Sequence, residues 1–166
     1  MAGPHTLAET ERAVESRIAG MDLDFEAMAV ASNLFRAANA VRNHLEGTVL
    51  RPHDLTWTAF VVLWVIWIWE KVETRVIADE GGFSKATLSG VLSTLEGRSL
   101  LVRERSPQDG RLVLVHLTPA GRRLMKKLFP EFNEQERVIV SGIPAAQRGQ
   151  TAEALRTLAL VVSEPR

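Results

Sequence analysis

Hydroxyl and cationic side chains recur along residues 84–111, and they are the groups in this chain best suited to chemistry. Hydroxyls donate and accept hydrogen bonds, and Lys and Arg donate to anions. The set therefore suits phosphate oxygens and base edges better than bond cleavage. Such groups on one predicted helix, its cap included, are found at Ser84, Lys85, Thr87, Ser89 and Ser93 among others. Arg111 follows in a predicted β-hairpin, from which one long cation can extend.

Charge is distributed unevenly along the chain, although the 20 basic and 20 acidic residues of the 166-residue sequence cancel. Residues 1–50 carry four basic and seven acidic side chains, whereas residues 85–127 carry nine basic and three acidic ones. The second segment is the one that would meet a polyanion. A solvated surface of mixed charge explains the same composition equally well, so charge alone leaves both interpretations open.

Enzymatic, redox and metal chemistry find little support in the sequence. There are no cysteines, which excludes disulfides, thiolate nucleophiles and cysteine-ligated zinc. The chain has no glycine-rich phosphate loop, no nucleophile elbow and no HExxH motif. The histidines lack metal-like spacing, although His44 and His53 could approach each other across a turn. We therefore expect no enzyme activity, no cofactor and no metal site.

Membrane and secretory signals are absent from the sequence pattern. The longest apolar run, residues 60–69, is ten residues long, against the roughly 20 that a membrane-spanning helix needs. The first residues show neither a basic region nor an apolar region of the kind found in secretory signals. We therefore expect a cytoplasmic protein with no membrane partner.

Apolar periodicity and capping residues predict a mainly α-helical chain with one small β-hairpin. The expected helices are 7–19, 24–46, 57–71, 74–80, 85–97, 119–140 and 145–162. Gly47 is expected to end the second helix, and Pro130 to bend the sixth. Segment 57–71 is apolar almost all round and holds all four tryptophans, which favours a buried helix over a buried strand. Residues 100–105 and 111–117 are predicted to pair around a turn at 106–110.

Residues 55–117 thus hold three helices followed by a hairpin, the order of a helix-turn-helix with a wing. On helix 85–97, Leu88, Leu92 and Leu95 share a face that we expect to be buried. The opposite face has only small groups and hydroxyls, Ala86 among them, so its backbone can approach base edges in the major groove. Arg111 at the hairpin tip is expected to reach the adjacent minor groove.

Four pieces of this region, in this order and at these spacings, resemble the MarR family of winged-helix transcriptional regulators. They are residues 83–89, 95–103, 106–115 and 117–121, and the wider resemblance covers about residues 25–162. It implies a single domain, with a winged helix-turn-helix lobe at 51–118 and dimerisation helices at 1–50 and 119–166. It also implies a homodimer that places helix 85–97 of each subunit in successive major grooves of a pseudo-palindromic operator in double-stranded DNA.

The family wing pattern Asp-Pro-x-Asp-x-Arg falls on Ser106, Pro107, Asp109 and Arg111. The resemblance implies that Asp109 orients Arg111, and that Arg111 enters the minor groove. The leading wing aspartate is here replaced by Ser106, which is the first departure from the pattern.

The second departure is Gly90, which stands where family members often have an arginine. A glycine inside a helix costs roughly 1 kcal/mol relative to alanine. Because Gly90 has no side chain, the reading of bases is left to Lys85 and the neighbouring hydroxyls. We therefore expect direct contacts with bases to give only modest sequence specificity. Arg103 and Arg105 alternate on their strand and point to one side, where either phosphates or solvent would surround them.

An aromatic wall is predicted on helix 57–71. Trp57, Phe60 and Trp64 lie on one side of it, and His44 comes from the preceding helix. In the MarR family, aromatic effectors often bind between the dimer helices and the DNA-binding lobe, so these four are the candidate ligand residues. Simple filling of the core is the alternative role for the rings.

The sequence therefore predicts a sequence-specific, dimeric DNA-binding transcriptional regulator, a repressor relieved by a small molecule such as an aromatic compound. The alternative is a winged helix used for protein–protein interaction without DNA binding. Zero net charge and Gly90 are the features that favour this alternative.

Overall fold

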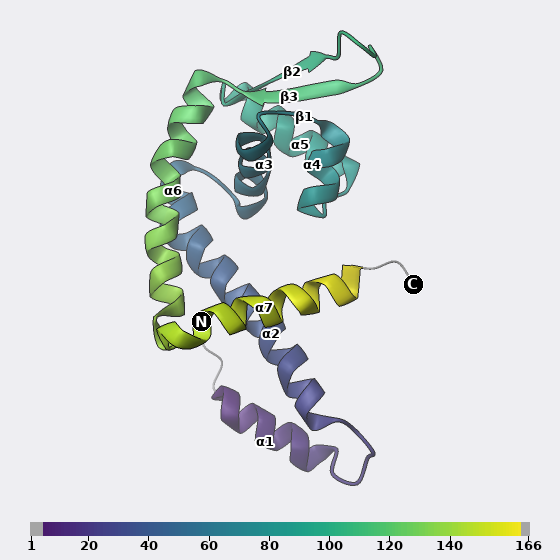
Figure 1. Cartoon of the computed structure of the whole chain (residues 1–166), viewed down its shortest axis with the longest axis vertical. Helices are drawn as coiled ribbons and strands as arrows, with labels where there is room; N and C mark the ends of the chain where they lie inside the picture. The colour runs from purple at the N-terminus through teal and green to yellow at the C-terminus, as the bar shows by residue number, and fades with distance from the viewer. Residues whose placement is uncertain (1–4, 164–166) are drawn as a thin grey trace. The chain divides into compact units, whose positions relative to one another are not determined.

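The structure is a computed structural model that describes residues 5–163. The chain divides into two compact units, Met1–Asn43 and His44–Arg166. The first unit is helical, and the second combines helices with a three-stranded antiparallel sheet (Figure 1). This mainly α-helical fold with a small β wing is the predicted one.

The first unit is made of α1 (Leu7–Arg17) and most of α2 (Phe25–Leu45). A capping box starts α1, because the Thr6 hydroxyl accepts from the Glu9 N–H at 3.2 Å and Glu9 accepts from the Thr6 N–H at 2.7 Å. Asp24 caps the start of α2, because its Oδ1 accepts from the Ala27 N–H at 2.8 Å. Helix α1 ends at Arg17, two residues before the expected end at residue 19.

Gly47 does not end the helical path, and this prediction was wrong. After α2, the chain continues through a π-helical turn, η1 (Glu46–Leu50), and a 3-10 turn, η2 (Arg51–His53). The reason is burial, because Val49 and Leu50 are buried and a continued helical path keeps both in the core. The path ends at Asp54, whose φ of 53° lies in the left-handed region.

Helix α3 (Trp57–Trp69) forms where the sequence predicts a buried helix, and Thr56 caps it by accepting from the Ala59 N–H at 3.2 Å. It is buried only in part, because Trp64, Ile68 and Trp69 are exposed. Its predicted end at residue 71 was wrong. Glu70 takes a positive φ of 63°, and the next three residues form β1 (Lys71–Glu73). This strand pairs antiparallel with β3, where Val72 faces Val115. A three-residue strand is too short to show an alternating pattern in the sequence.

The sheet has the strand order β1-β3-β2, with β2 (Leu101–Arg105) and β3 (Val113–Leu117) forming the predicted hairpin. The second strand begins two residues later than expected, because Arg111 and Leu112 belong to the turn. The Leu112 N–H donates to the Asp109 carbonyl at 2.9 Å there. Helices α3, α4 and α5 lie beside the sheet in Figure 1, and α3 packs on both the other helices and on β3.

The helix-turn-helix is formed by α4 (Thr74–Gly81) and α5 (Lys85–Gly97). Gly82 makes the turn at a φ of +65°, a conformation that glycine adopts without strain. The predicted inward face of α5 is confirmed, since Leu88, Leu92 and Leu95 are all buried. Their burial turns the small-residue face outward.

Helix α6 (Pro119–Ile139) starts at the predicted cap, where Thr118 accepts from the Gly121 N–H at 3.0 Å. The helix runs through Pro130 and is followed by a 3-10 turn, η3 (Val140–Gly142), and α7 (Ala145–Ser163). No side chain of α7 is buried among the described residues. None of the helices described between residues 5 and 163 is both long and apolar enough to cross a membrane.

Candidate nucleic-acid interface

The outward face of α5 is polar and open. Ser84, Lys85, Ala86, Thr87, Ser89 and Ser93 are all exposed. Ser84 accepts from the Thr87 N–H at 3.1 Å, and the two hydroxyls lie 2.9 Å apart. A methyl group added at Gly90 would contact nothing within 4 Å. The six predicted α5 residues are therefore all accessible from solvent, and position 90 between them carries no side chain.

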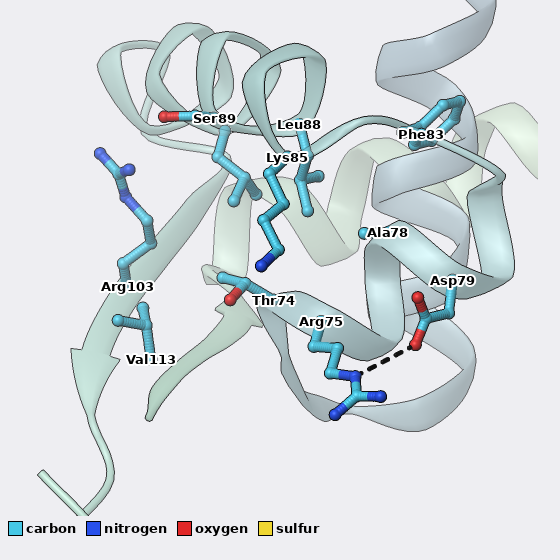
Figure 2. A pocket seen from close by; sticks show the side chains of 11 residues that line it. Thr74, Arg75, Ala78, Asp79, Phe83, Lys85, Leu88, Ser89, Arg103 and Val113 are labelled. Atoms are coloured by element: carbon cyan, nitrogen blue, oxygen red, sulfur yellow. Dashed lines mark ion pairs between the residues drawn. The ribbon is translucent and has the colours of Figure 1, made fainter. Parts of the chain in front are cut away.

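A hollow of about 760 Å³ lies between α4, α5 and the two hairpin strands. Figure 2 shows the Lys85 side chain extending into it, with Arg103 on its strand side and Arg75 paired with Asp79 on α4. Leu88 and Leu92 contribute apolar lining. Lys85 is thus held beside the concave surface that separates the helix-turn-helix from the wing.

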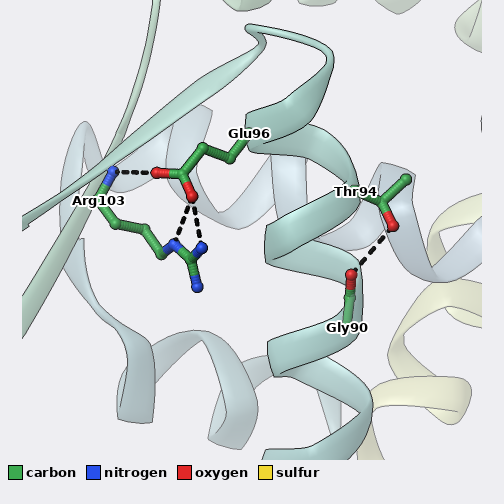
Figure 3. Close-up of polar contacts among 4 residues, drawn as sticks. All are labelled: Gly90, Thr94, Glu96 and Arg103. Carbon is green, nitrogen blue, oxygen red and sulfur yellow. Dashed lines mark hydrogen bonds and ion pairs between the residues drawn. The ribbon is translucent and has the colours of Figure 1, made fainter.

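Arg103 is engaged within the protein. Its Nε donates to Glu96 Oε2 at 2.9 Å and its N–H to Glu96 Oε1 at 3.3 Å, and its guanidinium also pairs with the same carboxylate (Figure 3). These hydrogen bonds hold the pKa of the Glu96 carboxyl below its usual value. Arg103 therefore joins the wing strand to α5, whereas the sequence suggested either phosphate or solvent around it.

Ser106 organises the wing turn. It is 7% exposed, and its hydroxyl oxygen accepts from the N–H groups of Gln108 and Asp109, each at 3.3 Å. The same hydroxyl donates to Gln108 Oε1 at 3.1 Å. Serine and aspartate side chains can both accept from N–H groups two and three residues further on. The departure from the family pattern at this position therefore leaves the turn chemistry in place.

The wing tip holds its arginine through the backbone. Asp109 Oδ1 accepts from the Arg111 N–H at 3.0 Å and lies 3.6 Å from Arg111 Nε. This hydrogen bond fixes the backbone of Arg111. The Arg111 side chain is 95% exposed, so its guanidinium remains available to a ligand from solvent. Arg105 donates across the turn to the Gly110 carbonyl at 3.3 Å. Asp109 is thus placed to orient Arg111.

Two of the four candidate ligand residues belong to an aromatic cluster. Trp57 and Phe60 lie with their ring centroids 6.2 Å apart, and Phe60 stacks on Phe132 of α6 at 4.5 Å. Phe60 is buried. The sequence reasoning missed Phe132, and the apolar positions of α6 were the only signal for it. Much of this cluster fills the core between α3 and α6.

The other two candidate ligand residues differ in their surroundings. His44 Nε2 lies 2.8 Å from Gln135 Oε1, one helical turn beyond Phe132 on α6. Trp64 is 40% exposed. His53, which the sequence suggested could approach His44, has Glu131 as its partner, with His53 Nε2 3.1 Å from Glu131 Oε2. Among the described residues, no group of three or more His, Cys, Asp or Glu is arranged to hold a metal.

The fold and the exposed polar surface define a winged helix-turn-helix protein. The model of the MarR family matches residues 55–113. The HTH-type transcriptional regulator YwaE of Bacillus subtilis, itself uncharacterised, is 37% identical over 137 residues, which cover 82% of this chain and 80% of YwaE. The chain belongs to the MarR family of transcriptional regulators.

Solved structures agree with this assignment. BpsR of Bordetella bronchiseptica, described with regulation of its DNA binding by 6-hydroxynicotinic acid, is 30% identical, with a TM-score of 0.70. The match covers 78% of this chain and 98% of BpsR. Sco3205 of Streptomyces coelicolor, in complex with DNA, has a TM-score of 0.76 at 20% identity and covers 87% of this chain and 92% of its own. At that identity, the second likeness shows the fold alone.

Proposed function

We propose that this chain acts as a homodimeric repressor that binds a pseudo-palindromic operator in double-stranded DNA. The observation that carries the proposal is the pairing of an open α5 face with an ordered wing tip. Helix α5 offers hydroxyls and Lys85 to base edges and phosphates. The wing offers Arg111, 95% exposed and fixed at its backbone by Asp109, to a neighbouring minor groove.

Exposed apolar side chains support the homodimer. Helix α2 exposes Phe25, Met28, Val30, Leu34 and Phe35, and α7 exposes Leu155, Leu160, Val161 and Val162. Helices that bear such stripes are stable when another surface covers them. A second copy is the partner proposed for them, which gives 1–50 and 119–166 the dimerisation role and 51–118 the DNA-binding role.

A small-molecule effector is the second part of the proposal. The relative BpsR is described as regulated by 6-hydroxynicotinic acid, an aromatic acid. In this chain, Trp57 and Trp64 on α3 and His44 beside α6 offer aromatic and polar contacts at the border of the DNA-binding lobe. A ligand that binds one spacing of the two recognition helices more tightly would shift the dimer away from the DNA-bound state.

Fluorescence anisotropy with labelled duplex DNA tests the proposal. The first duplex to be measured is the DNA upstream of the gene that encodes this protein. Affinity should fall steeply between about 50 and 200 mM salt, with a slope near −0.9 for each phosphate neutralised. Arg111→Ala should weaken binding at every salt concentration. A protein that binds neither this DNA nor random duplex at low salt would instead act as a protein-interaction module. The effector part fails if a metabolite panel gives no saturable change in tryptophan fluorescence.

A further inference from the structure

Four exposed cations gather on the first turns of α6, apart from the DNA-contact residues proposed on α5 and the wing. We call Arg122, Arg123, Lys126 and Lys127 the α6 basic cluster. Residues 119–130 contain these four cations and no carboxylate. Within residues 5–163, each ion pair that the structure shows involves other side chains. The cluster is therefore a concentrated positive surface in a chain of zero net charge.

The charges of the cluster oppose the local electrostatics of the helix. Arg122 and Lys126 are four residues apart, as are Arg123 and Lys127, and like charges at this spacing repel each other. Arg122, at the end of the first turn of α6, also meets the positive end of the helix dipole. A glutamate at this position would relieve both effects. An anionic partner would relieve them as well, and the arrangement therefore favours a surface that is neutralised on binding.

The cluster is rigidly connected to the recognition helix. The Thr118 hydroxyl donates to the Ser99 carbonyl at 2.7 Å, just beyond the end of α5. At Gly121 the contact is so close that an added Cβ would lie 2.0 Å from the Leu100 carbonyl oxygen. Met125 and Leu128, on the inner side of the same turns, are fully buried. Figure 1 shows that α6 begins directly after β3. These contacts therefore hold the first turns of α6, and with them the basic cluster, next to the end of α5 and the wing.

We infer that the α6 basic cluster is an additional DNA-contact surface, which binds the phosphate backbone of the duplex that flanks the operator. This inference rests on the proposed DNA-binding function. Duplex DNA is the polyanion that a rigid neighbour of the recognition helix would meet. Arginine and lysine without base-reading geometry contribute affinity that is independent of sequence. The cluster therefore adds binding strength on longer DNA without changing the operator that is read.

The test compares two lengths of one operator, selected with the wild-type protein from a random-sequence library. The short duplex holds the operator alone, and the long duplex adds about one helical turn, about 10 bp, of arbitrary sequence on each side. The cluster variant is R122Q/R123Q/K126Q/K127Q, since glutamine is a good helix former. The control variant R12Q/R17Q/R42Q/R156Q removes the same charge from exposed arginines elsewhere that take part in none of the ion pairs described. Anisotropy titrations across a salt series give affinity and slope.

Wild type should bind the long duplex more tightly, with a salt slope steeper by about 0.9 for each added phosphate contact. The cluster variant should lose this gain and bind the short duplex like wild type, whereas the control variant should keep the gain. If the cluster variant does not fold by circular dichroism, R123Q/K127Q takes its place. The inference is overturned if wild type shows no effect of length, if the cluster variant keeps the gain, or if the control loses it equally.

These outcomes separate the two claims. Binding of the short duplex without any effect of length would leave the proposed function standing and remove the role of the cluster. Failure of the library to yield any bound duplex at low salt would overturn both.

Discussion

Ser106 illustrates how a single side chain maintains the wing. Its hydroxyl accepts from two N–H groups of the turn that positions Asp109, and Asp109 in turn holds the backbone of Arg111. The arginine is therefore placed by a short relay of local hydrogen bonds. None of these bonds requires the aspartate that is usual at the first position of the family pattern.

Replacement of Ser106 tests this relay. Ser106→Ala leaves two N–H groups of a half-buried turn without their acceptor, so we expect about 1 kcal/mol lower stability and weaker DNA binding. Ser106→Asp supplies an acceptor at the same place and should retain wild-type binding. Thermal unfolding and anisotropy would be measured on both variants. Equal binding by the alanine variant would show that the relay is dispensable.

At the scale of elements, α5 combines a buried leucine face with an outer face that has no side chain at Gly90. The Thr94 hydroxyl donates to the Gly90 carbonyl at 3.0 Å (Figure 3). The backbone carbonyl of Gly90 therefore has a side-chain partner on the next turn of the helix. The open space around Gly90 means that a methyl group would cause no clash within the protein. Any effect of that methyl group on DNA binding would therefore arise at the DNA.

Gly90→Ala should separate folding from recognition. Alanine is favoured over glycine in a helix interior by about 1 kcal/mol, so the unfolding temperature should rise. DNA affinity should fall, because the methyl group keeps the helix backbone away from the base edges. The readouts are calorimetry and anisotropy. Unchanged or tighter binding would contradict the view that α5 uses a close backbone approach.

Two ion pairs that involve strand β2 give the lobe a defined response to acid. Hydrogen bonds from Arg103 and from Lys71 lower the pKa values of Glu96 and Glu104 respectively. A lowered pKa in the folded state stabilises the fold above the unfolded pKa, about 4.3 for glutamate, and this contribution is lost as the pH falls through the folded value. The stabilisation from both pairs should therefore be fully present and unchanged from pH 6 to 8, and it should be lost as the pH falls below about 4.5.

The double variant E96Q/E104Q checks this sign. Its unfolding temperature should fall less steeply than that of wild type between about pH 5 and pH 3, since it lacks the two groups whose protonation breaks the pairs. Thermal unfolding at a series of pH values provides the measurement. A decline as steep as that of wild type would assign the acid response to other carboxylates.

The predicted elements that proved right are those with strong local signals. The leucine stripe of α5 and the caps Ser84 and Thr118 depend on residues a few positions apart, which the sequence displays directly. Strand β1 depends on pairing with a strand some 40 residues away, and Phe132 on contact across two helices. Such long-range contacts leave no local pattern. The sequence indicates an ion pair between Glu96 and a neighbouring arginine, but the structure is needed to identify Arg103 as the partner.

At the scale of the whole molecule, assembly is the central property. Helices α2 and α7 expose several large apolar side chains, and Phe35 alone is 72% exposed. The sequence pattern predicts these stripes as helix faces, but it contains no information on what covers them. The proposed dimer gives both helices a partner.

Substitution of exposed apolar residues tests the dimer. Phe35→Glu and Leu160→Glu should each shift the protein toward monomer, because a buried unpaired charge is costly at an interface. Val102→Glu, at an exposed position on the wing, serves as the control and should remain dimeric. Light scattering coupled to size exclusion reports the mass. A wild type that is monomeric at all concentrations would contradict the assembly.

Hydroxyl-radical footprinting of the selected operator tests the central claim most directly. If two α5 helices occupy successive major grooves and the wings occupy the flanking minor grooves, protection should be symmetric, with a repeat of about 10 bp. Arg111→Ala should lose the outermost minor-groove protection and keep the centre. A footprint without two-fold symmetry, or one that Arg111→Ala leaves unchanged at its edges, would contradict the account.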